Sequence, residues 1–96
     1  MTPIETTIIQ TLINKTKSGA LKWRAEKDNH FATINSAKDT RIEVLDVHTG
    51  ILPVHLFQND LHLDTISLND SAKAIELLTA ILANRADRLN AFAADI

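Results

Sequence analysis

Apolar residues in the first part of the chain recur at the spacing of a single helical stripe. They are Ile4, Ile8, Ile9, Leu12 and Ile13. Thr2, Pro3 and Glu5 supply an N-cap hydroxyl, a first-turn proline and the carboxylate of a capping box. Gly19 supplies the left-handed residue that commonly follows a helix. The pattern predicts a helix over residues 3–17.

From residue 21 to residue 67, apolar and polar side chains alternate with the period of two that is typical of half-buried strands. Two-residue turns at Asp28-Asn29 and at Asn59-Asp60 would give each of two hairpins one apolar face. The first face comprises Leu21, Trp23, Ala25, Ala32, Ile34 and Ser36. The second comprises Leu52, Val54, Leu56, Leu61, Leu63 and Thr65. The alternation therefore predicts an antiparallel meander.

The strand expected over residues 40–47 is less regular, because Leu45 and Val47 fall on the face opposite its other apolar residues. Either a bulge next to Leu45 returns both side chains to the core, or both are exposed on the outer face. A turn is expected at residues 48–50. Pro53 cannot donate a ladder hydrogen bond, so it indicates an edge strand or an outward-facing irregularity.

The last part of the chain predicts a long helix over residues 69–94. Residues 67–70 offer several possible caps before it, and Ser67 and Asp70 are spaced like a capping box. Its apolar stripe comprises Ile75, Leu78, Leu82, Leu89 and Phe92, widened by Ala74, Leu77 and Ile81. At 1.5 Å per residue this helix exceeds about 30 Å, whereas a six-residue strand spans about 20 Å. The helix is therefore expected to overhang the sheet, unless it breaks near Asn84.

These elements predict an α+β fold in a single domain over residues 1–96. We expect a two-layer structure in which a five-stranded antiparallel meander packs both helices on one face. Its predicted core comprises Ile8, Ile9, Leu12, Leu21, Trp23, Ile34, Ile42, Val44, Val54, Leu56, Leu63, Ile75, Leu78 and Leu82. A length of 96 residues with 45% apolar and 23% charged residues suits one modest core.

Composition excludes several classes of function. The chain has no cysteine, so it has no thiol nucleophile and no thiolate metal site. It shows neither a secretory signal nor an apolar run long enough for a membrane span, and we expect a cytoplasmic protein. No serine lies in a Gly-x-Ser-x-Gly elbow, and two glycines cannot make a phosphate-binding loop. We therefore predict no enzymatic activity, no cofactor and no metal.

Two candidate sites are weaker alternatives. His55, His62 and Asp64 share the outer face of one predicted hairpin, where His55 would oppose Asp64. They could form a two-histidine, one-carboxylate site, although a mixed polar face explains them more simply. Separately, a basic segment over residues 15–27 contains Lys15, Lys17, Lys22, Arg24 and Lys27. Nucleic acid is disfavoured as a partner, because Phe31 among acidic neighbours is a poor stacking platform and the net charge is −2.

The segment Thr16-Lys17-Ser18-Gly19-Ala20-Leu21-Lys22-Trp23 contains a Thr-x-x-Gly-x-Leu-x-Trp motif, a helix stop followed by an inward leucine and tryptophan. In this motif and in its element order the chain resembles a loose group of small uncharacterised bacterial and phage proteins. The resemblance covers the first forty residues best, and the long leucine- and alanine-rich helix departs from it. It implies an interaction role and carries no catalytic residues.

The overhanging helix end would expose apolar surface that a monomer cannot cover easily. We therefore expect a non-enzymatic protein–protein interaction protein, homodimeric through the C-terminal helix. The expected partner-binding residues are Leu82, Arg85, Leu89, Phe92 and Ile96. The alternatives are an inhibitor or immunity protein from a phage or genomic island, which binds a foreign protein, and a weak nucleic-acid binder that uses the 15–27 segment.

Overall fold

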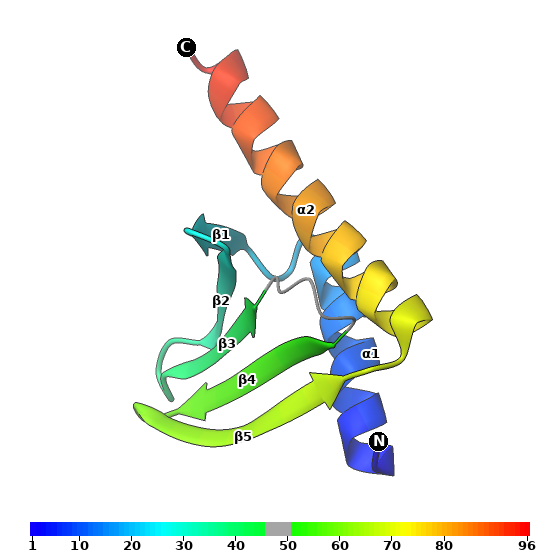
Figure 1. Ribbon diagram of the computed structural model, residues 1–96. Coiled ribbons are helices and arrows are strands. Elements are labelled where there is room, and N and C mark those ends of the chain that lie inside the picture. The colour runs from blue at the N-terminus through cyan, green and yellow to red at the C-terminus, as the bar shows by residue number, and fades with distance from the viewer. Residues whose placement is uncertain (46–50) are drawn as a thin grey trace.

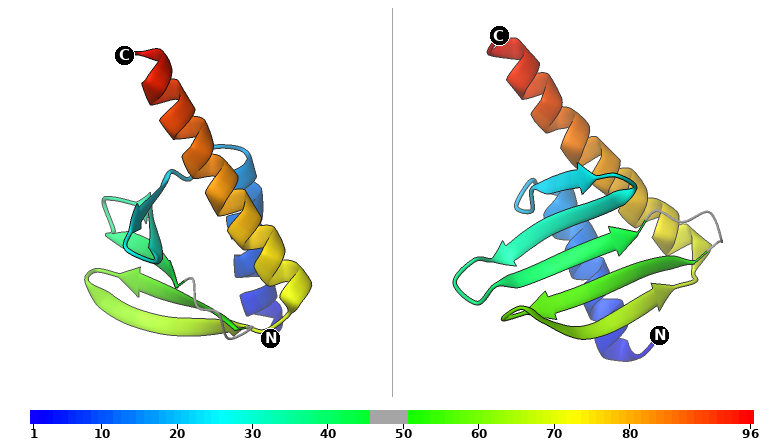
Figure 2. Two further views of the ribbon diagram at one scale, coloured as in Figure 1. Left: turned by 45° about the horizontal axis from the view of Figure 1, so that its top comes forward. Right: turned by 60° about the vertical axis from the view of Figure 1, so that its left-hand side comes forward.

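The computed structural model describes residues 1–45 and 51–96, and it confirms the expected α+β fold (Figure 1). The elements are α1 (Pro3–Lys17), β1 (Trp23–Glu26), β2 (Asn29–Asn35), β3 (Thr40–Leu45), β4 (Leu52–Gln58), β5 (Leu61–Leu68) and α2 (Ser71–Ala94). The five strands form one antiparallel sheet in the order β1-β2-β3-β4-β5. The right-hand view of Figure 2 shows both helices behind this sheet, with α2 extending past β1. The turn expected at residues 48–50, and Val47, lie outside the described residues.

Helix α1 begins and ends as its sequence predicts. The Thr2 hydroxyl accepts a hydrogen bond from the Glu5 N–H at 3.3 Å, and the Glu5 carboxylate accepts one from the Thr2 N–H at 3.0 Å. The backbone hydrogen bond from Thr2 is the main reason why the pKa of Glu5 is lowered. Gly19 follows the helix with a φ of +81°. Ile9, Leu12 and Ile13 are buried, whereas Ile4 is exposed at the open end of the stripe.

The register of the first hairpin differs from the predicted one by two residues. Its turn consists of Lys27 and Asp28, because Glu26 pairs with Asn29 and Trp23 with Ala32. A shift of two residues leaves every side chain on its expected face, so Trp23 still points inward. The same shift moves Ile34 past the end of the short strand β1, and the β2–β3 register is irregular between Thr33 and Asn35. Ile34 is therefore exposed rather than part of the core. His30 is buried on the inner face instead.

The second hairpin has the expected turn, in which Asn59 and Asp60 both take positive φ values of 54° and 67°. Beyond the turn, the register shifts, because Phe57 pairs with His62 but Leu56 pairs with Asp64. Leu63 is thus the extra residue of a bulge, and it is exposed although it was predicted to be buried. Past the bulge, Ile66 and Leu68 are the β5 residues that enter the core.

The centre of the sheet decides between the alternatives for β3 and corrects the expectation for β4. Leu45 pairs with Asn29 in continuous register and is half-buried, so no bulge returns it to the core. Pro53 lies in β4, which pairs with β3 and β5, so the prediction of an edge strand was wrong. The β3–β4 register ends at the pair Val44–Val54, one residue short of Pro53. The missing proline N–H therefore falls outside that ladder.

Helix α2 is continuous past Asn84. It begins at Ser71 rather than at residue 69, because the Asp70 carboxylate caps it by accepting hydrogen bonds from the N–H groups of Ala72 and Lys73 at 3.1 and 3.2 Å. The predicted capping box between Ser67 and Asp70 was therefore wrong. Within the described ranges, neither helix has the combination of length and apolar character that a membrane span needs.

The face that α2 buries is not the one expected. Leu77, Ala80, Ile81 and Asn84 are its buried residues. Ile75 and Leu82, which were predicted to lie in the core, are exposed, and Leu78 is half-buried. The helix carries two apolar stripes, and the one that packs on the core contains a small residue, Ala80, and an amide, Asn84.

A single core joins the two layers. Its buried members are Ile9, Leu12, Ile13, Leu21, Trp23, Ala32, Ile42, Val44, Leu52, Val54, Ile66, Leu68, Leu77 and Ile81. Ile8 and Leu56, both predicted core residues, are partly buried against it. The two helices are also joined at the surface, where the Lys73 ammonium lies 2.6 Å from the Gln10 amide oxygen and the Lys17 ammonium 3.2 Å from the Glu76 carboxylate. The hydrogen bonds from the two lysines lower the pKa of Glu76.

Candidate partner-binding site

The position of α2 relative to the sheet is set by Asn84. Its amide oxygen accepts a hydrogen bond from the Trp23 N–H at 3.0 Å, where β1 begins. Its amide nitrogen donates to the carbonyl oxygens of Leu21 at 2.8 Å and of Thr16 at 3.2 Å. Asn84 is 8% exposed, so one side chain satisfies three backbone groups at a buried junction of α1, β1 and α2.

Trp23 completes this junction. Its indole N–H donates to the Thr16 hydroxyl at 2.9 Å, and that hydroxyl donates to the Leu12 carbonyl at 2.6 Å. The Trp23 carbonyl accepts a hydrogen bond from the Arg88 guanidinium. The backbone N–H, the backbone carbonyl and the side chain of Trp23, the first residue of β1, are thus all hydrogen-bonded. These contacts fix α2 against β1 as far as Arg88.

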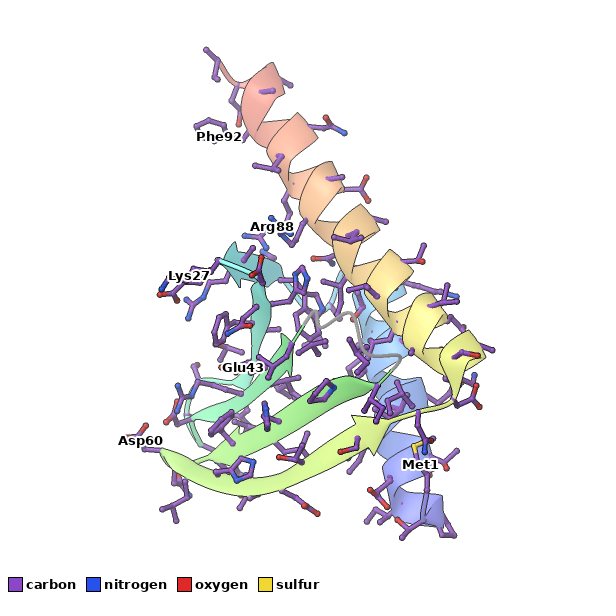
Figure 3. The ribbon with its side chains drawn as sticks, in the orientation of Figure 1. Met1, Lys27, Glu43, Asp60, Arg88 and Phe92 are labelled. Carbon is purple, nitrogen blue, oxygen red and sulfur yellow. The ribbon has the colours of Figure 1, made fainter. Side chains whose placement is uncertain are left out.

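Beyond this junction the last part of α2, with the two residues that follow it, forms an overhang, which we define as residues 86–96. Every residue of the overhang is exposed, and the exposed fractions of Leu89, Phe92 and Ile96 are 63%, 67% and 93%. Figure 3 shows Phe92 well away from the sheet, on the side of α2 that also carries Arg88. The expected apolar overhang is therefore present.

Four of the five residues expected to bind a partner lie on one face of α2, and Ile96 follows the last residue of the helix, Ala94, by two positions. Together with Ile75 and Leu78 they follow an alternating spacing of three and four residues, and we call this set the seam. It comprises Ile75, Leu78, Leu82, Arg85, Leu89, Phe92 and Ile96. Leu78 and Arg85 are half-buried and the other five are exposed. The seam thus follows a heptad pattern on the side of α2 that does not face the core.

A groove of about 360 Å³ separates the overhang from the edge strand β1. From β1 it is lined by Trp23 and Arg24, and from α2 by Arg85, Arg88, Leu89 and Phe92. Three of the lining residues are arginines, and the other four, Ala25 included, are apolar. Sequence reasoning missed this groove, because its second wall comes from a strand sixty residues away.

The structure brings together two of the three candidate metal ligands. The rings of His55 and His62 have centroids 5.5 Å apart, and a nitrogen of each lies within 2.8 Å of the Thr65 hydroxyl. The bulge in β5 places Thr65 opposite His55, where Asp64 was expected. The Asp64 carboxylate accepts instead from the Thr65 N–H at 2.8 Å. Over residues 1–45 and 51–96, no three potential ligands of the His, Cys, Asp or Glu type gather in one place.

The basic segment is divided among several elements. Lys17 is paired with Glu76 across the two helices, and the Arg24 guanidinium lies 5.8 Å from the centre of the Phe31 ring on the outer sheet face. The hollow beside Phe31 is lined by Glu26 and Glu43 as well as by Arg24 and Arg41. Carboxylates thus share this face with its cations, as expected from the sequence.

No family model, curated protein or solved structure matches this chain. The resemblance to small bacterial and phage proteins thus stays a prediction.

Proposed function

We propose that the protein is a non-enzymatic interaction protein that forms a homodimer through the C-terminal part of α2. The observation that supports this proposal is the exposed seam, because it continues along a helix whose neighbouring stripe already packs on the core. Large apolar side chains at regular spacing on a solvent-facing helix are typical of a helix–helix interface.

A second copy of the same helix is a suitable occupant of this surface. An alternating spacing of three and four residues allows two helices to pack along their whole seams. A two-fold axis uses the same patch on both subunits, so one exposed surface on each chain suffices. Ala86 and Ala93 flank the seam on the overhang, and their small side chains allow the two helix axes to come close.

The proposal predicts that charges placed in the seam separate the dimer without unfolding the subunit. In the double variant Leu89→Asp with Phe92→Asp, each chain would have to bury two charged carboxylates in place of the apolar side chains of the interface, which is unfavourable by several kcal/mol. Size-exclusion chromatography with light scattering, over a hundredfold range of concentration, should give a mass near twice 10.6 kDa for the wild type and 10.6 kDa for the variant.

A matched control adds the same two charges elsewhere on the same turns. Ala91→Asp with Ala94→Asp places them on the opposite side of the overhang, since successive residues are about 100° apart around a helix. This control should stay dimeric, and far-UV circular dichroism should be unchanged in both variants. A seam variant that remains dimeric, or a wild type that is monomeric throughout, would contradict the proposal. A monomeric wild type would instead favour the alternative in which the seam binds a foreign protein.

A further inference from the structure

We infer that the two copies pair antiparallel about a two-fold axis between Asn90 and Ala91, so that the tip of each α2 lies in the groove beside β1 of the other. This inference rests on the homodimer proposed above and adds the orientation and register of its helices. It follows from the position of the charges along the seam.

Arg85 is the one charged residue of the seam, and it discriminates among the possible pairings. In a parallel pair the two Arg85 side chains would lie in the same layer. Antiparallel registers that keep the seams in contact differ by whole heptads. A register with Arg85 opposite Ile75 would leave Phe92 and Ile96 beyond the start of the second α2, so the registers to compare place Arg85 opposite Leu82, Leu89 or Ile96 of the second copy. The first two leave the Arg85 residues only three or four positions apart along the axis, about 4.5 or 6 Å at 1.5 Å per residue.

The third register separates the like charges. When Arg85 lies opposite Ile96, the two Arg85 residues are eleven positions apart, or about 16 Å, which is twice the Debye length of about 8 Å at physiological salt. The central layers of this register are then apolar, since Leu89 of each copy meets Phe92 of the other. The register opposite Leu89 also brings the two Arg88 residues together at the axis, which adds a second repulsion.

The third register also pairs opposite charges. Asp95 is the only acidic residue after Asp87, and in this register it comes alongside Arg85 and Arg88 of the second copy. These arginines line the groove with Arg24, and the tip that enters it carries Phe92 and Ile96 beside Asp95. The groove, which has three arginines, thus receives an apolar tip that carries one carboxylate. The two-fold axis repeats this contact at the other end of the paired helices.

The fold leaves room for this arrangement. The axis lies in the middle of the overhang, where every residue from 86 to 96 is exposed. The two sheets consequently lie at opposite ends of the paired helices. In the same register, Ala86 of each copy lies opposite Ala93 of the other, so small residues flank the contact on the side away from the arginines.

Charge reversal tests the register directly. Arg85→Glu and Asp95→Arg each place like charges against each other in a homodimer, so sedimentation equilibrium at 50 mM salt should show a dissociation constant at least tenfold above that of the wild type. An equal mixture of the two variants should form a heterodimer within threefold of the wild-type affinity. In that heterodimer the introduced glutamate meets the introduced arginine at one end, and the native Arg85 meets the native Asp95 at the other. Arg88 is left unchanged, since it binds the Trp23 carbonyl.

The control mixes Arg85→Glu with Asp87→Arg, a charge reversal on the opposite side of α2. Its heterodimer should not come within threefold of the wild-type affinity, because the introduced glutamate still meets Asp95 at one end. Recovery in the Asp95→Arg mixture alone would support the inferred register. A wild-type dimer that is disrupted by the two seam aspartates, but whose charge-reversal variants do not recover on mixing, would overturn the register and keep the homodimer. A monomeric wild type would overturn both.

Discussion

Replacement of Asn84 by alanine is expected to lower the free energy of unfolding by about 3–5 kcal/mol, because each buried polar group that loses its partner costs about 1–3 kcal/mol. The variant deprives the Trp23 N–H and the Leu21 carbonyl of their partners, and leaves the Thr16 carbonyl with only the Gly19 N–H, 3.2 Å away. The whole free energy of unfolding of a domain of this size is about 5–15 kcal/mol. Urea denaturation followed by far-UV circular dichroism measures the loss.

The matched control is Asn90→Ala, which removes an exposed amide from the same helix. Surface substitutions of this kind usually change stability by less than about 0.5 kcal/mol, and alanine favours the helix. If Asn84→Ala were as stable as the control, water would replace the amide at the junction, and Asn84 would not hold α2 against β1.

Asn84 also explains why the buried face of α2 could not be predicted. An amide is rarely buried unless it has partners, so the polar position at residue 84 indicated the end of the apolar stripe. Its partners are backbone groups of a helix end and a strand start about sixty residues earlier, which no local pattern reveals. The spacing does carry one signal, since Asn84 follows Ala80 and Ile81 by four and three residues and so continues their stripe.

The strands show that alternation of apolar and polar residues does not determine strand register. Alternation fixes which side chains share a face, but a register shift of two residues preserves the alternation. This is why Trp23 and Ala32 were placed on the correct face while Ile34 was assigned to the core. In the second hairpin, Asn59-Asp60 indicated the turn correctly. No local pattern indicated the bulge at Leu63, which leaves Leu63 exposed and turns Ile66 and Leu68 into the core.

The candidate site was predictable in part. The seam residues share one face because their spacing alone requires it, and helix length alone implies an overhang. The groove depends on where β1 crosses α2, and so on the hydrogen bonds of Asn84 and Arg88. Local pattern therefore identified the apolar surface, whereas tertiary contacts decide which part of it lies beside the three arginines.

Replacement of Trp23 by alanine is expected to cost about 3–5 kcal/mol, the range for removing a buried aromatic side chain from a core. Trp23 is 1% exposed and packs where α1, β1 and α2 meet. Trp23→Phe retains most of the packing but loses the indole N–H bond to Thr16, so its cost should be about 1–2 kcal/mol. Because this is the only tryptophan, unfolding must be followed by far-UV circular dichroism rather than by fluorescence.

The two Trp23 variants together separate packing from hydrogen bonding. Equal losses for alanine and phenylalanine would show that the hydrogen bond to Thr16 dominates, contrary to the burial of the ring. A Trp23→Ala variant with the urea midpoint of the wild type would mean that β1 contributes little to the core. In that case the edge strand would not be fixed against α2, and the groove that receives the tip of the second copy would lose its second wall.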